Sequence, residues 1–200
     1  MSTDTVIVAS SILSQFRQAL LDILQTDEST PEITSLITAK AAARVRALVA
    51  DAASKGATIH TASGTSSAFS SSKQSEKPLE LDSKVPAMII EGLERSMDLF
   101  TQESFGPILS MISVGSADEA VKIVNECRYG LSSAIHTKNH YEALFLAKRM
   151  RVGATHINGA TVHDESTLPH GGYGDSGWGR FGGEWGLREF VHTKTVMMNK

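Results

Sequence analysis

The start of the chain changes from strand-like to helix-like patterns of hydrophobic residues. Thr5–Ala9 is rich in β-branched side chains, which is typical of a strand. In residues 12–24 apolar residues recur every three or four positions, which predicts an amphipathic helix. A second helix is predicted for residues 33–55, with Gly56 after its end, and a short strand for Ala57–Thr61. The expected buried face of the second helix consists of Ala41, Val45, Leu48, Val49 and Ala52.

Serine dominates the next stretch, residues 62–77. Such a composition buries little apolar surface, so the pattern predicts a flexible surface loop. A loop that carries regulatory phosphorylation sites is the alternative.

Strands and helices alternate between residues 86 and 158. The predicted strands are Pro86–Ile90, Pro107–Val114, Leu131–His136 and Ala154–Asn158. Pro107–Val114 is almost continuously apolar, as expected for a strand buried on both faces. Helices capped by Ser116 and Asn139 separate the last three strands. Strands joined in this way pair in parallel, so the predicted fold class is α/β, with a parallel sheet flanked by helices.

Glycine dominates the end of the chain. Eight of the sixteen glycines fall between Gly171 and Gly186. A short helix over Glu184–Phe190 and a terminal strand over Lys194–Asn199 are expected in this region.

Two overlapping strings here, Gly172–Gly177 and Gly177–Gly182, have the Gly-x-Gly-x-x-Gly spacing of a dinucleotide-binding fingerprint. That fingerprint follows a buried strand, opens a helix and precedes an acidic residue by about 20 positions. The first string follows Pro169 and His170 instead, so a close-packed loop is preferred over a phosphate-binding one. Gly174–Gly177 also spells Gly-Asp-Ser-Gly, as in trypsin-like proteases, but the α/β pattern argues against their double β-barrel.

Composition and charge narrow the functional classes. The chain has 200 residues, 41% of them hydrophobic and 20% charged, which suits one folded domain or slightly more. A net charge of −3 gives no general attraction to nucleic acid or anionic lipid. No apolar run approaches the roughly 20 residues of a membrane span, and the first residues do not resemble a signal peptide. We therefore expect a cytoplasmic protein that binds neither nucleic acid nor membrane.

Metal-ligating and nucleophilic side chains are sparse. His163, Asp164 and Glu165 form a local cluster, but three consecutive residues cannot all face one ion. The single cysteine, Cys127, lies late in an amphipathic helix, where a buried hydrophobic role is expected. No metal site and no internal disulfide are predicted.

Glu103–Pro107, with the sequence Glu-Ser-Phe-Gly-Pro, directly precedes a predicted buried strand. In an extended run the side chains of Glu103 and Phe105 point to the same side. A carboxylate accepts hydrogen bonds from sugar hydroxyls, and an aromatic face packs on a flat ring. The structural alternative is a turn whose Gly and Pro lead into the strand.

Taken together, these strings resemble the C-terminal part of the aldehyde dehydrogenase superfamily, and the tail is most similar to benzaldehyde and salicylaldehyde dehydrogenases. The segments that carry the resemblance are Glu103–Pro107, Asn125 with Tyr129–Ser133, Gly153–Asn158, Pro169–Gly172, Ser176–Arg180 and Lys194–Val196. The resemblance implies a truncated catalytic domain over residues 1–190 and an oligomerisation strand over residues 191–200. It also implies that the N-terminal dinucleotide-binding domain is absent.

In functional terms the resemblance implies NAD- or NADP-dependent oxidation of an aldehyde, aromatic for the most similar members, through a thiohemiacetal on a cysteine. It implies that Glu103 holds the nicotinamide ribose and that Phe105 contacts the nicotinamide. The loop from Gly159 to His170 would line the aldehyde channel, so His163 and His170 are substrate-pocket candidates. The last strand would join an oligomerisation sheet, so a homo-oligomer or a heteromer is expected.

The sequence departs from the family pattern at the catalytic centre. The family nucleophile lies in a Gly-Gln-x-Cys string just before a segment like residues 1–8, so it would precede Met1 and we expect that no catalytic residue is retained. His170 stands where the family usually has Phe, and Thr5 where a basic residue is common. We expect no dehydrogenase activity from this chain alone, because covalent aldehyde oxidation needs an activated thiolate, an oxyanion site and a bound dinucleotide.

Three interpretations stay open at this point. The chain is a truncated aldehyde dehydrogenase, a non-catalytic partner of a full-length relative, or an enzyme repurposed for acid–base chemistry. The acid–base candidates are His163, Asp164, His170 and Glu103. Removal of the dinucleotide-binding domain should bare an apolar face, so an oligomer is expected rather than a monomer.

Overall fold

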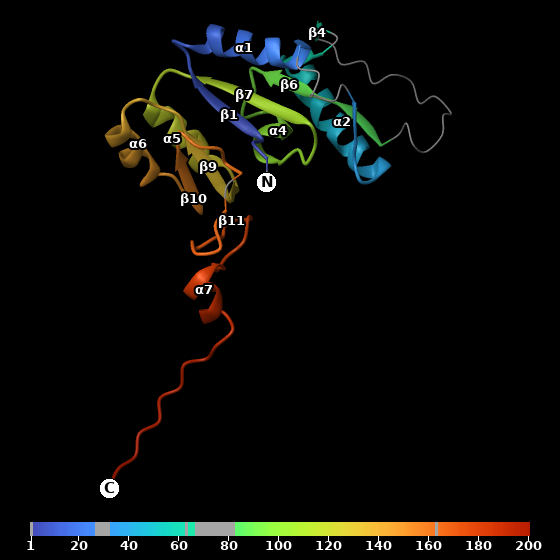
Figure 1. The fold of residues 1–200 in the computed structure, drawn as a ribbon. Helices are drawn as coiled ribbons and strands as arrows, with labels where there is room; N and C mark the ends of the chain where they lie inside the picture. The colour runs from blue at the N-terminus through green and yellow to red at the C-terminus, as the bar shows by residue number, and fades with distance from the viewer. Residues whose placement is uncertain (1, 27–32, 63, 67–82, 163) are drawn as a thin grey trace. The chain divides into compact units, whose positions relative to one another are not determined.

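A computed structural model describes residues 2–26, 33–62, 64–66, 83–162 and 164–200. The chain forms two compact units, which we call the N-terminal unit, Thr3–Ala120, and the C-terminal unit, Val121–Lys200. Both contain helices and strands, as the predicted α/β class requires (Figure 1). None of the described helices is long and apolar enough to cross a membrane.

A five-stranded sheet with the order β1-β7-β6-β3-β4 forms the N-terminal unit. Its strands are β1 (Thr5–Ala9), β3 (Thr58–Thr61), β4 (Gly64–Ser66), β6 (Met88–Glu91) and β7 (Ile108–Val114). β7 lies between β1 and β6 and pairs with both in parallel, whereas β3 pairs antiparallel with β6 and β4. The central position of β7 explains its nearly continuous apolar sequence.

The predicted surface loop at residues 62–77 lies mostly outside the described residues. Where it is described, the prediction is partly wrong, because Gly64–Ser66 forms the edge strand β4. Backbone pairing with β3 gives this short segment a regular structure that its serine-rich composition does not predict.

Helices α1 (Leu13–Thr26) and α2 (Ala39–Ser54) flank this sheet (Figure 1). The predicted helix over residues 33–55 was too long, because β2 (Ile33–Ser35) pairs antiparallel with β5 (Lys84–Pro86). Thr38 then caps α2 by accepting a hydrogen bond from the Ala41 amide at 3.1 Å.

The end and the buried face of α2 follow the sequence closely. Gly56 has φ +100°, a left-handed conformation that favours glycine. The buried face of α2 consists of Ala42, Val45, Leu48, Val49 and Ala52, so the prediction was wrong at one position, with Ala41 in place of Ala42. The short helix α4 (Asp98–Thr101) contributes one further buried residue, Leu99.

The C-terminal unit is built from short elements, among them two pairs of strands. Parallel strands β9 (Ser132–Ile135) and β10 (Ala154–Ile157) are joined by α6 (His140–Ala147), as predicted. β8 (Tyr129–Gly130) pairs antiparallel with β11 (Tyr173–Gly174), and α7 (Gly183–Arg188) follows. The predicted sheet was too extensive, because β7 pairs with β1 and β6 and not with β9.

The predicted helix caps are present on α5 (Ala117–Glu126) and α6. The Glu119 amide donates to Ser116 Oγ at 3.2 Å, and the Glu119 carboxylate accepts from the Gly115 amide at 2.9 Å. Asn139 Oδ1 accepts from the Glu142 amide at 3.2 Å. These local hydrogen bonds fix where the two helices begin.

Residues 189–200 differ from the prediction of a terminal strand. They have no regular secondary structure within the single chain, and every residue from 191 to 200 is exposed. A strand needs a neighbour for its hydrogen bonds, and this segment has none within its own chain's sheets. A strand formed against a partner chain stays a prediction.

Candidate functional site

The loop that contains Glu103 and Phe105 enters the central strand β7 of the N-terminal unit. Phe105 has φ +48°, a left-handed conformation that costs a non-glycine residue about 1–2 kcal/mol. Its side chain is 79% exposed, although aromatic rings are normally buried. Gly106 packs against α2, where an added Cβ would lie 2.9 Å from Val45 Cγ2. The prediction of an extended run, with Glu103 and Phe105 on the same side, is therefore wrong, because the Phe105 backbone is left-handed. The loop turns here instead, as in the structural alternative, and the Phe105 ring is exposed to solvent.

Two side chains distant in sequence hold this loop. Asp4 Oδ1 accepts hydrogen bonds from the Ser104 amide at 3.1 Å and from Ser104 Oγ at 2.6 Å. Arg44 of α2 donates to the backbone oxygens of Glu103 at 2.7 Å and Ser104 at 3.2 Å. Neither contact is predicted by the sequence, because no local pattern links Asp4 or Arg44 to residue 104.

The Glu103 carboxyl group is partly withdrawn from water. Its pKa is raised by burial first and by the negative charge of Asp4 second, while Arg44 acts in the opposite direction. One braced loop therefore carries a partly buried carboxyl group, that of Glu103, and an exposed aromatic ring, that of Phe105.

His170 belongs to the C-terminal unit. Its Nδ1 lies 3.4 Å from Asp164 Oδ1, and its ring centroid lies 4.9 Å from that of Phe181. The backbones of His170 and Phe181 exchange two hydrogen bonds of 2.8 Å. His163, the other substrate-pocket candidate, lies outside the described residues.

Met1, which the family nucleophile is expected to precede, also lies outside the described residues. That no catalytic residue of the family is retained in this chain stays a prediction.

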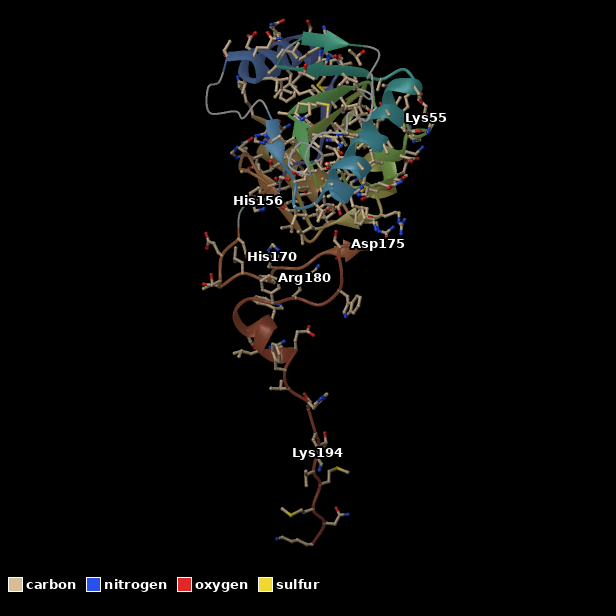
Figure 2. The ribbon with its side chains drawn as sticks, turned by 90° about the vertical axis from the view of Figure 1, so that its right-hand side faces the viewer. Lys55, His156, His170, Asp175, Arg180 and Lys194 are labelled. Carbon is tan, nitrogen blue, oxygen red and sulfur yellow. The ribbon has the colours of Figure 1, made fainter. Side chains whose placement is uncertain are left out.

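His170 and Arg180 lie near each other in the glycine-rich part of the chain (Figure 2). Both line an open pocket of about 370 Å³. The Arg180 guanidinium donates to the backbone oxygens of Gly172 at 3.0 Å and Gly179 at 2.6 Å. A Cβ on Gly171 would overlap the Gly179 carbonyl oxygen. The glycine strings therefore form a close-packed loop, as preferred from the sequence, and they do not follow a buried strand.

The remaining candidate groups have other surroundings. Cys127 is exposed, so the prediction of a buried cysteine is wrong: α5 ends at Glu126, one residue before it. Ser176 Oγ accepts a hydrogen bond from the Gly130 amide at 3.0 Å, which is a structural role for the protease-like string. In the described part of the chain, no three His, Cys, Asp or Glu residues are grouped for a metal ion.

The family model described as "Aldehyde dehydrogenase family" matches residues 1–196, and this chain belongs to that family. Benzaldehyde dehydrogenase of Bacillus subtilis (strain 168) is 40% identical over 112 residues, which are 56% of this chain and 23% of the relative. Vanillin dehydrogenase of Pseudomonas fluorescens is 40% identical over 111 residues, 55% of this chain and 23% of the relative.

Solved structures agree on the fold. Succinic semialdehyde dehydrogenase from Streptococcus pyogenes, in complex with NADP+, is similar with a TM-score of 0.78 and 27% identity, over 98% of this chain and 42% of that chain. Salicylaldehyde dehydrogenase from Pseudomonas putida G7 gives a TM-score of 0.76 at 24% identity, over 93% and 37%. This chain thus spans less than half of the length of these relatives.

Proposed function

We propose that these 200 residues provide the C-terminal part of an NAD- or NADP-dependent dehydrogenase for aromatic aldehydes. The similarity to benzaldehyde and vanillin dehydrogenases supports the substrate class. The observation that carries the proposal is the braced loop, in which Ser104 separates a residue with a partly buried carboxyl, Glu103, from one with an exposed ring, Phe105. This arrangement fits the nicotinamide and ribose end of the cofactor.

In this proposal the chain binds and orients the cofactor and the aldehyde, and the cofactor, when bound, accepts the hydride. Ionised Glu103 accepts hydrogen bonds from the ribose hydroxyls, and Phe105 packs against the nicotinamide. His170 contributes to the aldehyde-binding surface. The attacking thiol, the oxyanion donors and the phosphate-binding loop belong to residues outside these 200, on the same polypeptide or on a partner chain. Residues 1–200 alone are then not sufficient for turnover.

Binding of nicotinamide mononucleotide tests the proposal without turnover. We expect saturation-transfer NMR to show contact between the nicotinamide protons and the chain, lost in Phe105→Ala and weakened in Glu103→Ala. Glu94→Ala is the control, because Glu94 is an exposed loop glutamate of the same unit. Equal binding by all four proteins would contradict the assigned roles.

An assay of the 200-residue chain with benzaldehyde and NAD should give no NADH. Clear production of NADH would contradict the proposal that the attacking thiol and the oxyanion donors lie outside these residues.

Exposed apolar side chains support a second candidate function, that of a non-catalytic partner subunit. Phe190, Val196, Met197 and Met198 are 73–93% exposed in or beside the segment without secondary structure. We propose that this segment pairs with a second copy or with a full-length relative. Co-purification with a tagged full-length relative is expected, and its absence at micromolar concentrations would remove the heteromeric version.

The contact between Asp164 and His170 supports a third candidate, an acid–base site. A carboxylate 3.4 Å from Nδ1 orients an imidazole and leaves Nε2 for a substrate. If this site carries an activity, His170→Ala abolishes it and Asp164→Asn reduces it. Unchanged turnover in His170→Ala would exclude this function.

A further inference from the structure

Asp4 connects the loop that contains Glu103 and Phe105 to the sheet. It immediately precedes β1, and its backbone oxygen accepts a hydrogen bond from the Ser110 amide of β7 at 2.9 Å. The position of Asp4 is therefore fixed by the pairing of two neighbouring parallel strands. Its carboxylate reaches a residue 100 positions later in the chain, Ser104, which is 2% exposed.

Ser104 separates the two groups that the loop presents. Its amide and hydroxyl both donate to the same Asp4 oxygen, at 3.1 and 2.6 Å. On the other side of Phe105, the Gly106 amide donates to Ser104 Oγ at 3.4 Å, and Gly106 lies against Val45. The left-handed backbone of Phe105 persists only while both flanks are held, because a free residue of this type leaves that conformation.

We propose that Asp4 is a positioning residue, whose carboxylate holds Ser104 and thereby fixes the Glu103 carboxyl and the Phe105 ring in their ligand-binding arrangement. The identity of the ligand rests on the function proposed above. The arrangement of the loop itself rests only on the hydrogen bonds to Asp4 and Arg44 and on the contact of Gly106.

The charge of Asp4 has an effect separate from its hydrogen bonds. It is the second contributor, after burial, to the raised pKa of Glu103, and Arg44 opposes both. Asn in place of Asp4 retains an oxygen that accepts from Ser104 but removes the charge. Ala removes both, so the two substitutions separate geometry from electrostatics.

Hydrogen exchange and a carboxyl titration test the proposal in the full 200-residue chain. In Asp4→Ala and in Ser104→Ala we expect the backbone around residue 104 to exchange at least tenfold faster, since a charge-assisted hydrogen bond is lost. In Asp4→Asn we expect protection to be largely retained and the ¹³C titration midpoint of Glu103 to move to lower pH. Asp22→Asn is the matched control: Asp22 accepts from Gln18 at the exposed surface of α1, and neither measurement should change.

The outcomes distinguish this inference from the proposed function. Unchanged exchange at residue 104 in Asp4→Ala, with the chain folded, would overturn the positioning role. Unchanged exchange in Ser104→Ala would do the same if Asp4→Ala fails to fold. A Glu103 midpoint that does not fall in Asp4→Asn would overturn the electrostatic part. If wild type and Asp4→Ala behave as expected but nicotinamide mononucleotide binds neither, the proposed function fails while the positioning of the loop stands.

Discussion

The two units of this chain treat their hydrophobic side chains in opposite ways. Among the described residues, twenty of the buried hydrophobic residues belong to Thr3–Ala120 and three to Val121–Lys200. Of the large hydrophobic residues that are exposed, four belong to the N-terminal unit and fifteen to the C-terminal unit. The N-terminal unit therefore has a core of its own, whereas the C-terminal unit presents apolar surface of the kind that proteins bury in interfaces.

This difference in packing decides how rigidly each unit can hold a candidate functional side chain. The loop with Glu103 and Phe105 is braced by Asp4 and Arg44 against the well-packed sheet and α2. His170 depends on short backbone bridges and close-packed glycines instead. Precise positioning of a side chain needs rigid surroundings, so the loop with Glu103 and Phe105 is the more firmly held of the two candidate sites.

Gly153→Ala should have the largest effect on the C-terminal unit. A Cβ at this position would overlap the Gly171 carbonyl oxygen and lie 2.9 Å from that of Leu131, and neither backbone group can move easily. We expect a loss of more than about 4 kcal/mol, or failure of this unit to fold. Peptides covering β9 and β10 should lose hydrogen-exchange protection while those covering β1 and β7 keep it.

Gly159→Ala is the matched control for this experiment. Its Cβ would meet only His156 Cβ at 3.6 Å, an ordinary contact, so protection should change little. If Gly153→Ala unfolds β1 and β7 to the same extent as β9 and β10, the two units are one cooperative structure and the comparison fails.

Met111→Ala and Met198→Ala compare one residue type in the two units. Met111 of β7 is 0% exposed, so its truncation leaves a cavity and should cost about 2–5 kcal/mol in the free energy of unfolding. Met198 is 93% exposed, and its truncation should change the free energy of unfolding by less than about 0.5 kcal/mol. Urea titration monitored by circular dichroism measures both. Similar losses in the two variants would show that Met198 is buried in solution.

The double variant Val196→Lys and Met198→Lys tests whether the exposed C-terminal segment mediates self-association. Each of these side chains contributes about 1.5–3 kcal/mol when fully buried, so self-association through this segment should weaken at least tenfold. Asn199→Lys adds a charge in the same segment without removing an apolar group, and it should have little effect. Sedimentation equilibrium measures the dissociation constants, and a variant that associates as tightly as wild type would place the interface elsewhere.

The sequence predicts those parts of the fold whose signals are local. Strands β1 and β7, helices α5 and α6 and the turn at Gly56 follow from periodicity, caps and a glycine requirement. The features that the sequence does not predict depend on residues far away in the chain. β2 pairs with a strand about fifty residues later, and β7 pairs with β1 and β6 rather than with β9. The candidate site shows the same division.

Glu103 and Phe105 are visible in the sequence because a short string and its resemblance mark them. The Asp4 carboxylate and the Arg44 guanidinium are not, because their roles exist only after strands and helices from separate parts of the chain have packed. Likewise, Cys127 seemed to belong to an apolar face, but α5 ends at Glu126 and the thiol is exposed.

Within the N-terminal unit, Asp51→Asn should give a small loss of stability that depends on pH. The pKa of Asp51 is lowered from 3.8 mainly by the hydrogen bond from the Asp98 amide, at 2.8 Å, and further by Lys55. A lowered pKa in the folded state means that this contribution is present above pH 3.8 and is lost as the pH falls through the folded value. The difference between wild type and variant in thermal denaturation should therefore be present at pH 7 and shrink below pH 3.8. A difference that is constant with pH would exclude the ionised carboxylate as its cause.

Glu103→Gln should change stability in the opposite direction, with a gain at neutral pH instead of a loss. The pKa of Glu103 is raised by burial and by Asp4, so folding disfavours its ionised form. The ionised group therefore subtracts from stability at neutral pH, and this penalty disappears as the pH falls through the raised folded pKa. Because the side chain is only partly buried, the gain in Glu103→Gln is small, and it should be present at pH 7 and absent near pH 3. Loss of stability at pH 7 would mean that the Glu103 carboxylate has a stabilising partner within the chain. Its role would then be to stabilise the fold rather than to bind a ligand.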